Sequence, residues 1–463
     1  MRNRKIFAVL ICLAMIVALA VGCQNAETTS TTTGQTTTGQ TTTASQGTSQ
    51  TTTTEPPAEK VSLTYWALAR WAGVNGTEED GQIGDWQRDV AERYMAENPN
   101  VEEIEFEHVP GADIDQKLTV AIATSVQPNV LEDGITRGGK FARMDLLQPL
   151  NDYFTAEEMD DFLEGSWENG GIEVDGQYHM IPWSNSVQTM LINRTMFEEA
   201  GALDLLPQNE DRTWTYEEFR AAMEAVKSDS VYPSCFYLGS TAGDAYLYDF
   251  LMGNGVRLFD GDGNLSINTP ETAETIDFII SMINDGLSVP GAETMVFSDD
   301  RELFKQQKTA VCFIGGYPQV KGEMDNGNIE AFEIGFAMYP NAEGKAPGLE
   351  ANYIGYMVFK SESQVENDAA VGLAKFATNT ENSKALKIVN LIPLRKSVGD
   401  LYPGDEFAAW TKRIFKYSED PGYSLELYPT VTGEFIPMMQ GLVGGDKTTE
   451  EALEDLEAYV ISQ

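Results

Sequence analysis

The feature that most constrains the fold is a regular alternation of strand-like and helix-like segments that begins at Val61. Residues 61–66 (VSLTYW) are rich in β-branched and aromatic side chains, which predicts a strand. Residues 87–98 carry apolar side chains four positions apart, which is helical spacing, and residues 103–109 alternate apolar and acidic side chains like a half-buried strand. Helical spacing returns in residues 113–124. This order predicts an α/β domain with a mostly parallel sheet.

The size and charge of the chain limit the classes of protein to consider. Its 463 residues, of which 42% are hydrophobic, are enough for more than one hydrophobic core. The formal net charge is −41, and a surface this acidic repels nucleic acid and anionic lipid. Four cysteines in a chain of this length do not make a disulfide scaffold. We therefore expect an acidic α/β protein that does not bind nucleic acid.

The first 22 residues have the pattern of a signal peptide. Basic residues at positions 2, 4 and 5 precede an apolar stretch, residues 6–21, that is too short to span a membrane stably. The stretch ends in small residues directly before Cys23, an ending that resembles a bacterial lipobox. We predict that residues 1–22 are removed and that Cys23 carries the lipid. The alternative is an ordinary secretory signal followed by an incidental cysteine.

Residues 23–60 are predicted to be a disordered tether. They consist mainly of Thr, Gly, Gln and Ser, with the repeat TTTGQTTTGQTTTASQ and almost no apolar side chains. A segment of this composition cannot bury a core. As a flexible coil it would span roughly 35 Å, enough to hold a folded domain away from a membrane surface. The alternative is a disordered head on a secreted protein.

A second landmark is the stretch GQYHMIPWSNSVQTMLINRTMFEEAGA at residues 176–202, followed by TWTYEEF. Thr215 and Glu218 in the latter have capping-box spacing for a helix. Together with LLQPL at 146–150 and KTAVCFIGG at 308–316, this layout resembles the extracellular solute-binding proteins of ABC importers. The resemblance is to the sugar-binding group that includes maltose-binding protein. It covers about residues 61–463.

The resemblance implies a two-lobed, periplasmic-binding-protein-like α/β fold of type II. Two mostly parallel α/β domains are expected to be joined by three hinge crossings, near Ser184–Ser186, Phe313–Gly315 and Tyr356–Met357. The first lobe is expected to comprise residues 61–184 and 315–356, and the second lobe residues 187–312 and 358–463. Such proteins bind a ligand between the lobes by hinge closure.

The candidate ligand-binding residues are of two kinds. In open α/β sheets ligands bind beyond the carboxyl ends of the strands, and sugars stack their C–H faces on aromatic rings. The aromatic candidates are Trp71, Trp183, Tyr246, Tyr317 and Phe435. Position against the binding loops of the family adds hydrogen-bonding candidates, which are Arg70, Asp133, Arg137, Asn185 and Asp244.

Other residues invite a chemical interpretation that the sequence leaves weak or open. Two histidines, His108 and His179, without a Cys/His cluster do not predict a transition-metal site. Residues 260–271 have the acidic spacing of a calcium loop but lack its central glycine, so a tight turn is the alternative. Cys235 and Cys312 are expected to be free buried thiols, with a disulfide as the alternative. No cofactor, resident metal or catalytic residue is predicted.

We predict a lipid-anchored, extracellular substrate-binding component of an ABC importer, on the outer face of a bacterial, Gram-positive membrane. Its ligand is expected to be a carbohydrate, including oligosaccharides, and its partners the transmembrane subunits of a permease. It is expected to be a monomer and to meet the membrane only through its lipid. Two alternatives remain open. The same fold binds a peptide, polyamine or other organic solute, or the chain is an extracellular carbohydrate-active enzyme. The sequence does not name the sugar or the permease.

Overall fold

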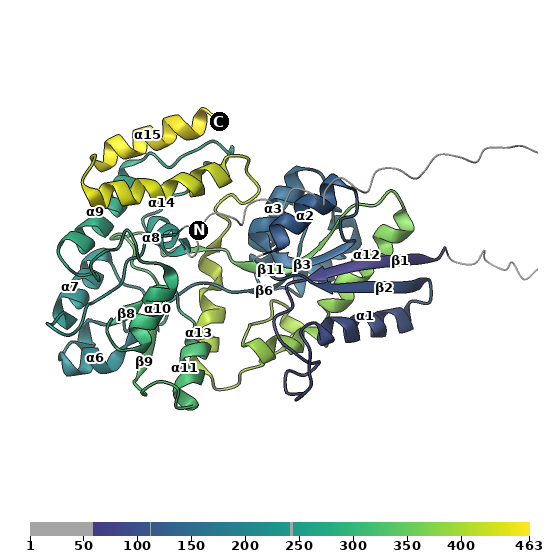
Figure 1. The fold of residues 1–463 in the computed structure, drawn as a ribbon, viewed down its shortest axis with the longest axis horizontal. Helices are drawn as coiled ribbons and strands as arrows, with labels where there is room; N and C mark the ends of the chain where they lie inside the picture. Colours follow the sequence, from purple (N-terminus) through teal and green to yellow (C-terminus); the bar gives the residue numbers. More distant parts are fainter. Residues whose placement is uncertain (1–58, 112, 241–243) are drawn as a thin grey trace, which may run out of the picture. The chain divides into compact units, whose positions relative to one another are not determined.

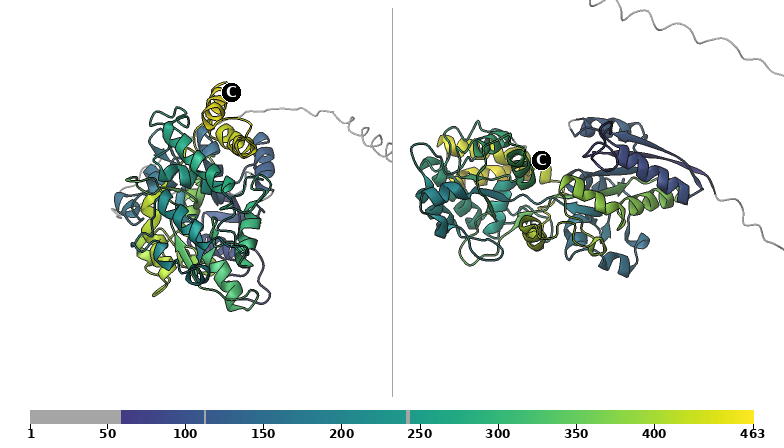
Figure 2. Two further views of the ribbon diagram at one scale, coloured as in Figure 1. Left: turned by 90° about the vertical axis from the view of Figure 1, so that its left-hand side faces the viewer. Right: turned by 90° about the horizontal axis from the view of Figure 1, so that it is seen from below.

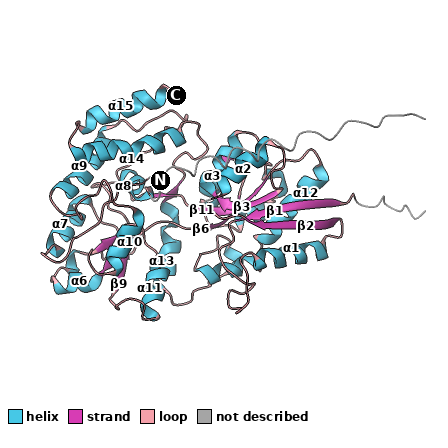
Figure 3. Ribbon diagram, in the orientation of Figure 1, coloured by secondary structure: helices cyan, strands magenta, loops and turns pink. Residues whose placement is uncertain are grey.

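The computed structural model describes residues 59–111, 113–240 and 244–463 (Figure 1). The predicted signal peptide, Cys23 and nearly all of the predicted tether lie outside these residues. Two sheets, each with its own helices, organise the described part of the chain (Figure 3). We call the part built on the larger sheet the first lobe and the part built on the smaller sheet the second lobe.

The first lobe is built on a mixed five-stranded sheet in the order β2-β1-β3-β11-β6. Strands β1 and β2 are parallel, as are β1 and β3, whereas β11 is antiparallel to both β3 and β6. The carboxyl ends of β1, β3 and β6 therefore meet at one edge of the sheet. The strands are β1 (Val61–Ala67), β2 (Val101–His108), β3 (Val130–Gly134), β6 (Ile181–Asn185) and β11 (Tyr353–Val358).

Helix α12 belongs to the first lobe, although its residues were expected in the second. It packs against β1, β3, β11 and α1, and its neighbourhood with α1 is visible in Figure 2. The Tyr94 hydroxyl of α1 donates to the carbonyl oxygen of Ala369, and a Cβ at Gly372 would lie 2.2 Å from that hydroxyl oxygen. The small residues of α12 allow this close approach. The helices of this lobe are α1 (Asp85–Glu97), α2 (Ile114–Ala123), α3 (Ile135–Arg143), α4 (Ala156–Asp160), α5 (Ser166–Gly170) and α12 (Gln364–Ala377).

The second lobe contains a three-stranded sheet in the order β8-β7-β9. Its strands are β7 (Met190–Asn193), β8 (Val311–Cys312) and β9 (Ile334–Ala337), and β7 is antiparallel to both neighbours. Two predictions are therefore wrong: this sheet is not mostly parallel, and β9 does not return to the first lobe. The local pattern of β9 identifies a strand, but the partner of a strand is decided by residues far away in the sequence.

Helices surround the small sheet of the second lobe (Figure 1). The predicted capping box at the start of α7 is confirmed, because the Glu218 amide donates to Thr215 Oγ1 at 3.1 Å and the Thr215 amide donates to Glu218 Oε2 at 2.8 Å. The helices are α6 (Arg194–Glu199), α7 (Tyr216–Val226), α8 (Ala245–Gly253), α9 (Pro270–Asn284), α10 (Phe297–Lys305), α11 (Tyr317–Asp325), α13 (Glu406–Ile414), α14 (Tyr428–Gly444) and α15 (Thr449–Ile461).

The remaining strands are short. Strands β4 (Glu173–Val174) and β5 (Gln177–Tyr178) form a hairpin in the first lobe. Strand β10 (Leu349–Glu350) pairs in parallel with β12 (Ser418–Glu419), and β10 packs against α8. Strand β10 lies on the stretch of chain that connects β9 to β11. Short 3₁₀ turns occupy Asn151–Tyr153, Leu203–Leu205, Asn382–Val389, Lys396–Val398 and Phe415–Tyr417.

The chain passes between the two sheets at positions that differ in part from the prediction. The first passage, residues 186–189 between β6 and β7, overlaps the predicted position at Ser186. The second lies at residues 338–352, between β9 and β11, and not at Phe313–Gly315, because β8 is followed by α11 and β9 in the same lobe.

The third passage lies between α12 and α13. It comes after Pro393, which forms a β-bridge with Ser184 of the first-lobe sheet. It leads into α13, where Trp410 packs on Phe336 of β9 with ring centroids 4.9 Å apart. The predicted position Tyr356–Met357 is wrong, since both residues lie inside β11 of the first sheet.

Candidate functional site

Three charged candidates meet at the carboxyl edge of the first-lobe sheet. Ala67 of β1 lies opposite Glu132 of β3, so Arg70, three residues beyond Ala67, follows the end of β1 at that edge. Helix α3 begins directly after β3, so Asp133 near the end of β3 lies four residues before Arg137 in the first turn of α3. Arg137 Nε lies 3.1 Å from Asp133 Oδ2, and Arg70 Nε lies 3.7 Å from Glu132 Oε1.

Neither of these two arginines donates a hydrogen bond to another described residue. Each of the other arginines in the described residues donates at least one hydrogen bond to the protein. Arg70 and Arg137 form ion pairs, but their buried Nε atoms have no hydrogen-bond partner. The facing oxygens, Glu132 Oε1 and Asp133 Oδ2, are also buried without one. Donors and acceptors thus lie side by side and unsatisfied at one sheet edge.

Glu132 is a site residue that the sequence analysis missed. Its side chain is fully buried, and its Oε2 accepts hydrogen bonds from Gln87 Nε2 at 3.0 Å, from the Tyr356 hydroxyl at 3.4 Å and from the Tyr65 hydroxyl at 3.5 Å. The sequence signal that could have identified it is an acidic residue inside the otherwise apolar strand VLEDG. A buried acid of this kind needs a partner, because carboxylates are rarely fully buried alone.

Burial raises the pKa of Asp133 to about 6, while Arg137, the Gly134 amide and Arg70 act in the opposite direction. The Gly134 amide donates to Asp133 Oδ1 at 2.7 Å. This carboxyl group therefore changes charge near neutral pH, within reach of both arginines.

Trp71 and Trp183 belong to a buried stack of rings. Trp86 of α1 lies between them, with ring centroids 5.3 Å from Trp71 and 5.4 Å from Trp183. All three side chains are buried, and Trp183 Nε1 donates to Ser383 Oγ at 3.0 Å. The prediction that these rings face a cleft is wrong for this structure, because each finds aromatic partners inside the first lobe.

Tyr246 and Phe435 are core residues of the second lobe, against the prediction. The Tyr246 hydroxyl donates to the Tyr237 carbonyl oxygen at 2.8 Å, and its ring stacks on Phe313. Phe435 packs against Tyr248, and the side chains of Tyr246 and Phe435 are at most 1% exposed. Both residues lie on helices, α8 and α14, whose apolar faces pack into the second lobe. Their side chains therefore point into the core and not toward a loop.

Asn185 and Tyr317 line a pocket at the first passage, which we call the crossing pocket. Its volume is about 430 Å³, and residues of both lobes line it. Asn185 Nδ2 donates to Ser418 Oγ at 3.0 Å, and the Tyr317 ring stacks on Phe407 with centroids 4.6 Å apart. The lining comprises residues 185–189, 314–319, 321, 322, 325, 389–392, 407 and 408, with Arg301, Tyr402, Asp405 and Thr411.

Asp244 lies at the start of α8, beside the undescribed residues 241–243. Burial raises its pKa to about 6, and the Tyr248 hydroxyl lies 3.4 Å from its Oδ2. A second buried carboxyl, Glu350 of β10, has its pKa raised to about 7, mainly by burial. Its Oε1 accepts hydrogen bonds from the hydroxyls of Tyr423 at 2.8 Å and Tyr428 at 3.2 Å. The sequence analysis did not identify this group.

Comparison with known families identifies the chain. The model of the bacterial extracellular solute-binding protein family matches residues 80–384, about two thirds of the sequence. The chain belongs to this family. The solved structure of the cyclic α-maltosyl-1,6-maltose binding protein of Arthrobacter globiformis matches 87% of this chain and 98% of that one, with a TM-score of 0.69 and 21% identity. This likeness confirms the predicted two-lobed α/β fold.

Curated relatives of this solute-binding protein are distant. A binding protein of Brucella abortus is 26% identical over 251 residues, which are 54% of this chain and 59% of that protein. The maltotriose-binding protein of Pyrococcus abyssi is 26% identical over 321 residues, which are 67% of this chain and 63% of that protein. The chain therefore spans about three fifths of the length of these curated relatives.

The acidic segment with calcium-like spacing is a turn. Asp260 Oδ1 accepts hydrogen bonds from the backbone amides of Asp262 and Asn264, both at 2.9 Å. The carboxylate thus closes its own loop. In the part of the chain that the structure describes, no group of three or more His, Cys, Asp or Glu side chains is placed to hold a metal ion.

The two described cysteines and the two histidines are parts of the folded structure and do not cluster into a site. Cys235 and Cys312 are buried free thiols, as predicted, and burial raises the pKa of both. His179 Nδ1 lies 3.2 Å from the Ile172 carbonyl oxygen, and burial lowers its pKa. His108 sits at the end of β2.

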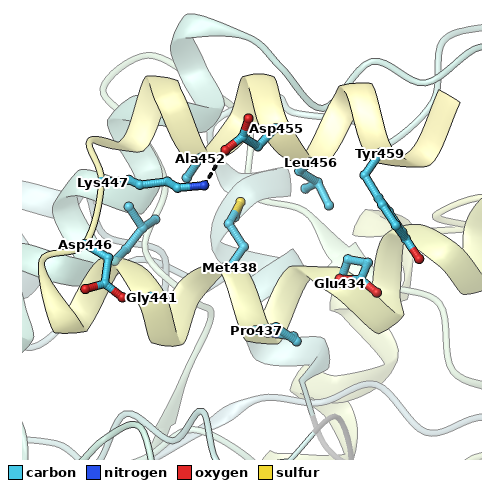
Figure 4. Close-up of a pocket in the computed structure, with 11 residues that line it drawn as sticks. Glu434, Pro437, Met438, Gly441, Asp446, Lys447, Ala452, Asp455, Leu456 and Tyr459 are labelled. Atoms are coloured by element: carbon cyan, nitrogen blue, oxygen red, sulfur yellow. Dashed lines mark hydrogen bonds and ion pairs between the residues drawn. The ribbon is translucent and has the colours of Figure 1, made fainter. Parts of the chain in front are cut away.

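A further pocket of about 530 Å³ lies between α14 and α15 (Figure 4). Met438, Leu456 and Tyr459 line it, and an ion pair joins Lys447 to Asp455 at one side. It contains none of the predicted ligand-binding residues. Among residues 59–463, apart from the four undescribed positions, no helix is long and apolar enough to cross a membrane.

Proposed function

We propose that this solute-binding protein captures a neutral carbohydrate, including oligosaccharides, for an ABC importer. The carboxyl edge of the first-lobe sheet, with Arg70, Asp133 and Arg137, is the part of the site that recognises hydroxyl groups. Closure of the lobes about the passages between them encloses the ligand and presents it to the permease.

The observation that carries this proposal is the pairing of unused donors with unused acceptors. A sugar hydroxyl donates one hydrogen bond and accepts others, so hydroxyls can satisfy the Arg70 and Arg137 guanidinium groups and the orphaned oxygen of Asp133 together. A carboxylate ligand only accepts, and would leave the Asp133 oxygen unpaired. It would also be repelled by a protein of net charge −41.

The ligands named for relatives support the same class. They include maltotriose for the Pyrococcus abyssi protein, diacetylchitobiose for a Streptomyces coelicolor protein, and cyclic α-maltosyl-1,6-maltose for the Arthrobacter globiformis structure. These ligands differ in size and linkage, but all are neutral and rich in hydroxyl groups.

A second candidate ligand is an organic cation such as a polyamine. It is favoured by the acids Asp244 and Glu350, which lie within electrostatic range of each other and close to tyrosine hydroxyls. Cations bind favourably to carboxylates and to aromatic faces. An ammonium group would, however, leave the donors of Arg70 and Arg137 unused.

The cellular setting completes the proposal. Cys23 carries a lipid, the segment up to residue 60 tethers the folded part, and the protein acts as a monomer on the outer face of a Gram-positive membrane. Its partners are the transmembrane subunits of the permease, and it binds carbohydrate without converting it. Incubation of purified protein with oligosaccharides, followed by product analysis, tests the last point. Appearance of shortened products would establish the enzymatic alternative.

A ligand panel tests the binding function. Calorimetry and thermal shift with maltotriose, diacetylchitobiose, an oligogalacturonate, spermidine and a tripeptide should give binding only for neutral sugars. Arg70→Ala and Arg137→Ala should each weaken sugar binding about tenfold or more, because each removes charged donors to hydroxyls. Arg88→Ala is the matched control, since Arg88 lies in the same lobe but its guanidinium is bonded to Asp85. Binding of spermidine instead of sugars would contradict the proposal.

A further inference from the structure

We infer that Glu132 is a positioning residue that holds the Arg70 guanidinium in place for ligand. The inference rests on the proposed function, because it assigns Arg70 to the ligand. Glu132 itself is fully buried and acts through Arg70.

The two oxygens of Glu132 have different roles. Oε2 accepts from three side chains on three elements: Gln87 of α1, Tyr65 of β1 and Tyr356 of β11. The Tyr65 and Tyr356 hydroxyls are 3.1 Å apart, so the two donors lie side by side at Oε2. With Oε2 held from three directions, the carboxylate plane is fixed and Oε1 is left for Arg70.

The burial of Glu132 explains why the Arg70 guanidinium is drawn toward it. A carboxylate removed from water is costly unless a charge and hydrogen bonds compensate it. Arg70 is the cation paired with Glu132 in the described residues, and its side chain keeps 26% of its surface exposed. The attraction therefore draws the guanidinium toward the buried end, while its remaining surface stays available at the sheet edge.

The length of the contact leaves Arg70 free to bind. At 3.7 Å from Oε1, Arg70 Nε is beyond hydrogen-bond distance, so the pair is held by charge alone. The pair of Arg257 and Glu419 is a useful contrast, because its Nε and Nη2 both donate to the carboxylate at 2.5 Å. That bidentate pair consumes the donors that a ligand would need. The looser Arg70 pair orients a guanidinium without consuming it.

The test combines a double-mutant cycle with a readout that needs no ligand. Glu132→Gln, Arg70→Ala and the double variant are compared for affinity toward maltotriose and diacetylchitobiose. Glu132→Gln should weaken binding about tenfold in the wild-type background and have no further effect when Arg70 is already Ala. In the ligand-free protein, ¹⁵N relaxation should show that the Arg70 Nε–H bond becomes more mobile in Glu132→Gln.

Controls separate positioning from folding. Asp249→Asn replaces another fully buried acid, in the second lobe, and should leave affinity and Arg70 mobility unchanged. Gln87→Met removes one support of Oε2 without changing any charge, and should give a smaller loss that again disappears in the Arg70→Ala background. If Glu132→Gln does not fold, the Gln87→Met variant tests the positioning role in its place.

The outcomes distinguish the two proposals. Equal losses from Glu132→Gln in both backgrounds, or unchanged Arg70 mobility, would overturn the positioning role. Unchanged affinity in Arg70→Ala, or no binding of either sugar, would overturn the proposed site instead. In that case the relaxation measurement still decides whether Glu132 restrains Arg70.

Discussion

The Tyr423 hydroxyl donates a 2.8 Å hydrogen bond to Oε1 of Glu350, while the carbonyl oxygen of the same tyrosine accepts one from Arg143 of α3 at 2.9 Å. Glu350 packs with α8 of the second lobe, and α3 belongs to the first. Tyr423 therefore connects the two lobes through a carboxyl group whose pKa is raised to about 7, which makes this connection sensitive to pH.

Glu350 should make the protein less stable as pH rises toward neutrality. The folded-state pKa of about 7 lies above the ordinary value of 4.5, so the folded protein binds this proton more tightly. The stabilisation is complete below about pH 4.5 and is lost as pH rises to about 7. Glu350→Gln should remove a difference on the order of 2 kcal/mol between pH 5 and 8. Urea unfolding across this range measures it.

Part of the pH dependence should survive in that variant, because the pKa values of Asp133, Asp244 and Asp300 are also raised. Glu434→Gln, in the pocket between α14 and α15, is the matched control. It should keep the wild-type slope of unfolding free energy against pH. A Glu350→Gln protein with the full wild-type slope would show that this carboxyl group does not titrate differently on folding.

Sugar affinity should fall as Asp133 becomes protonated. With a pKa of about 6, this group is charged at pH 7.5 and mostly neutral at pH 5. Charged acceptors form stronger hydrogen bonds with hydroxyl groups, so affinity at pH 5 should be a few-fold to about tenfold lower. Asp133→Asn should bind more weakly at pH 7.5 and show a flatter profile by calorimetry. A variant with the wild-type profile would place the titrating group elsewhere.

Truncation of a ring in the tryptophan stack should affect stability. Trp183 is 2% exposed and packs against Trp86 and Tyr356, so Trp183→Ala should cost about 3–5 kcal/mol of unfolding free energy. Tyr317→Ala should cost less, because Tyr317 is only half-buried at the crossing pocket. Calorimetric unfolding compares the two. A Trp183→Ala protein of wild-type stability but lost sugar binding would restore the prediction that this ring faces the ligand.

Membrane attachment should depend on one cysteine. If Cys23 carries the lipid, Cys23→Ala should release the protein into the medium, and Cys12→Ala, within the apolar stretch of the signal, should not. Immunoblots of washed cells and culture supernatant measure the distribution. Retention of the Cys23→Ala protein on washed cells would exclude this anchor.

Part of the candidate site was predicted from the sequence by position against the binding loops of the family. Their meeting at one edge agrees with the strand order, because Arg70 follows β1, Asp133 lies near the end of β3, and Arg137 comes four residues after Asp133. Four of the aromatic candidates are buried in the cores, because exposure is not a local property. Whether Trp183 or Phe435 faces solvent depends on Trp86 and Tyr248, which lie far away in the sequence.

The sequence by itself determined the elements of this protein: the strands and helices from Val61 onward and the capping box at Thr215. Each depends on side chains within a few residues, where backbone sterics and amphipathic period act. Only the tertiary structure decided that β9 joins the second lobe, that α12 covers the first sheet and that Glu132 faces Arg70. Strand pairing, helix packing and buried charge depend on partners brought together by folding, which no local pattern encodes.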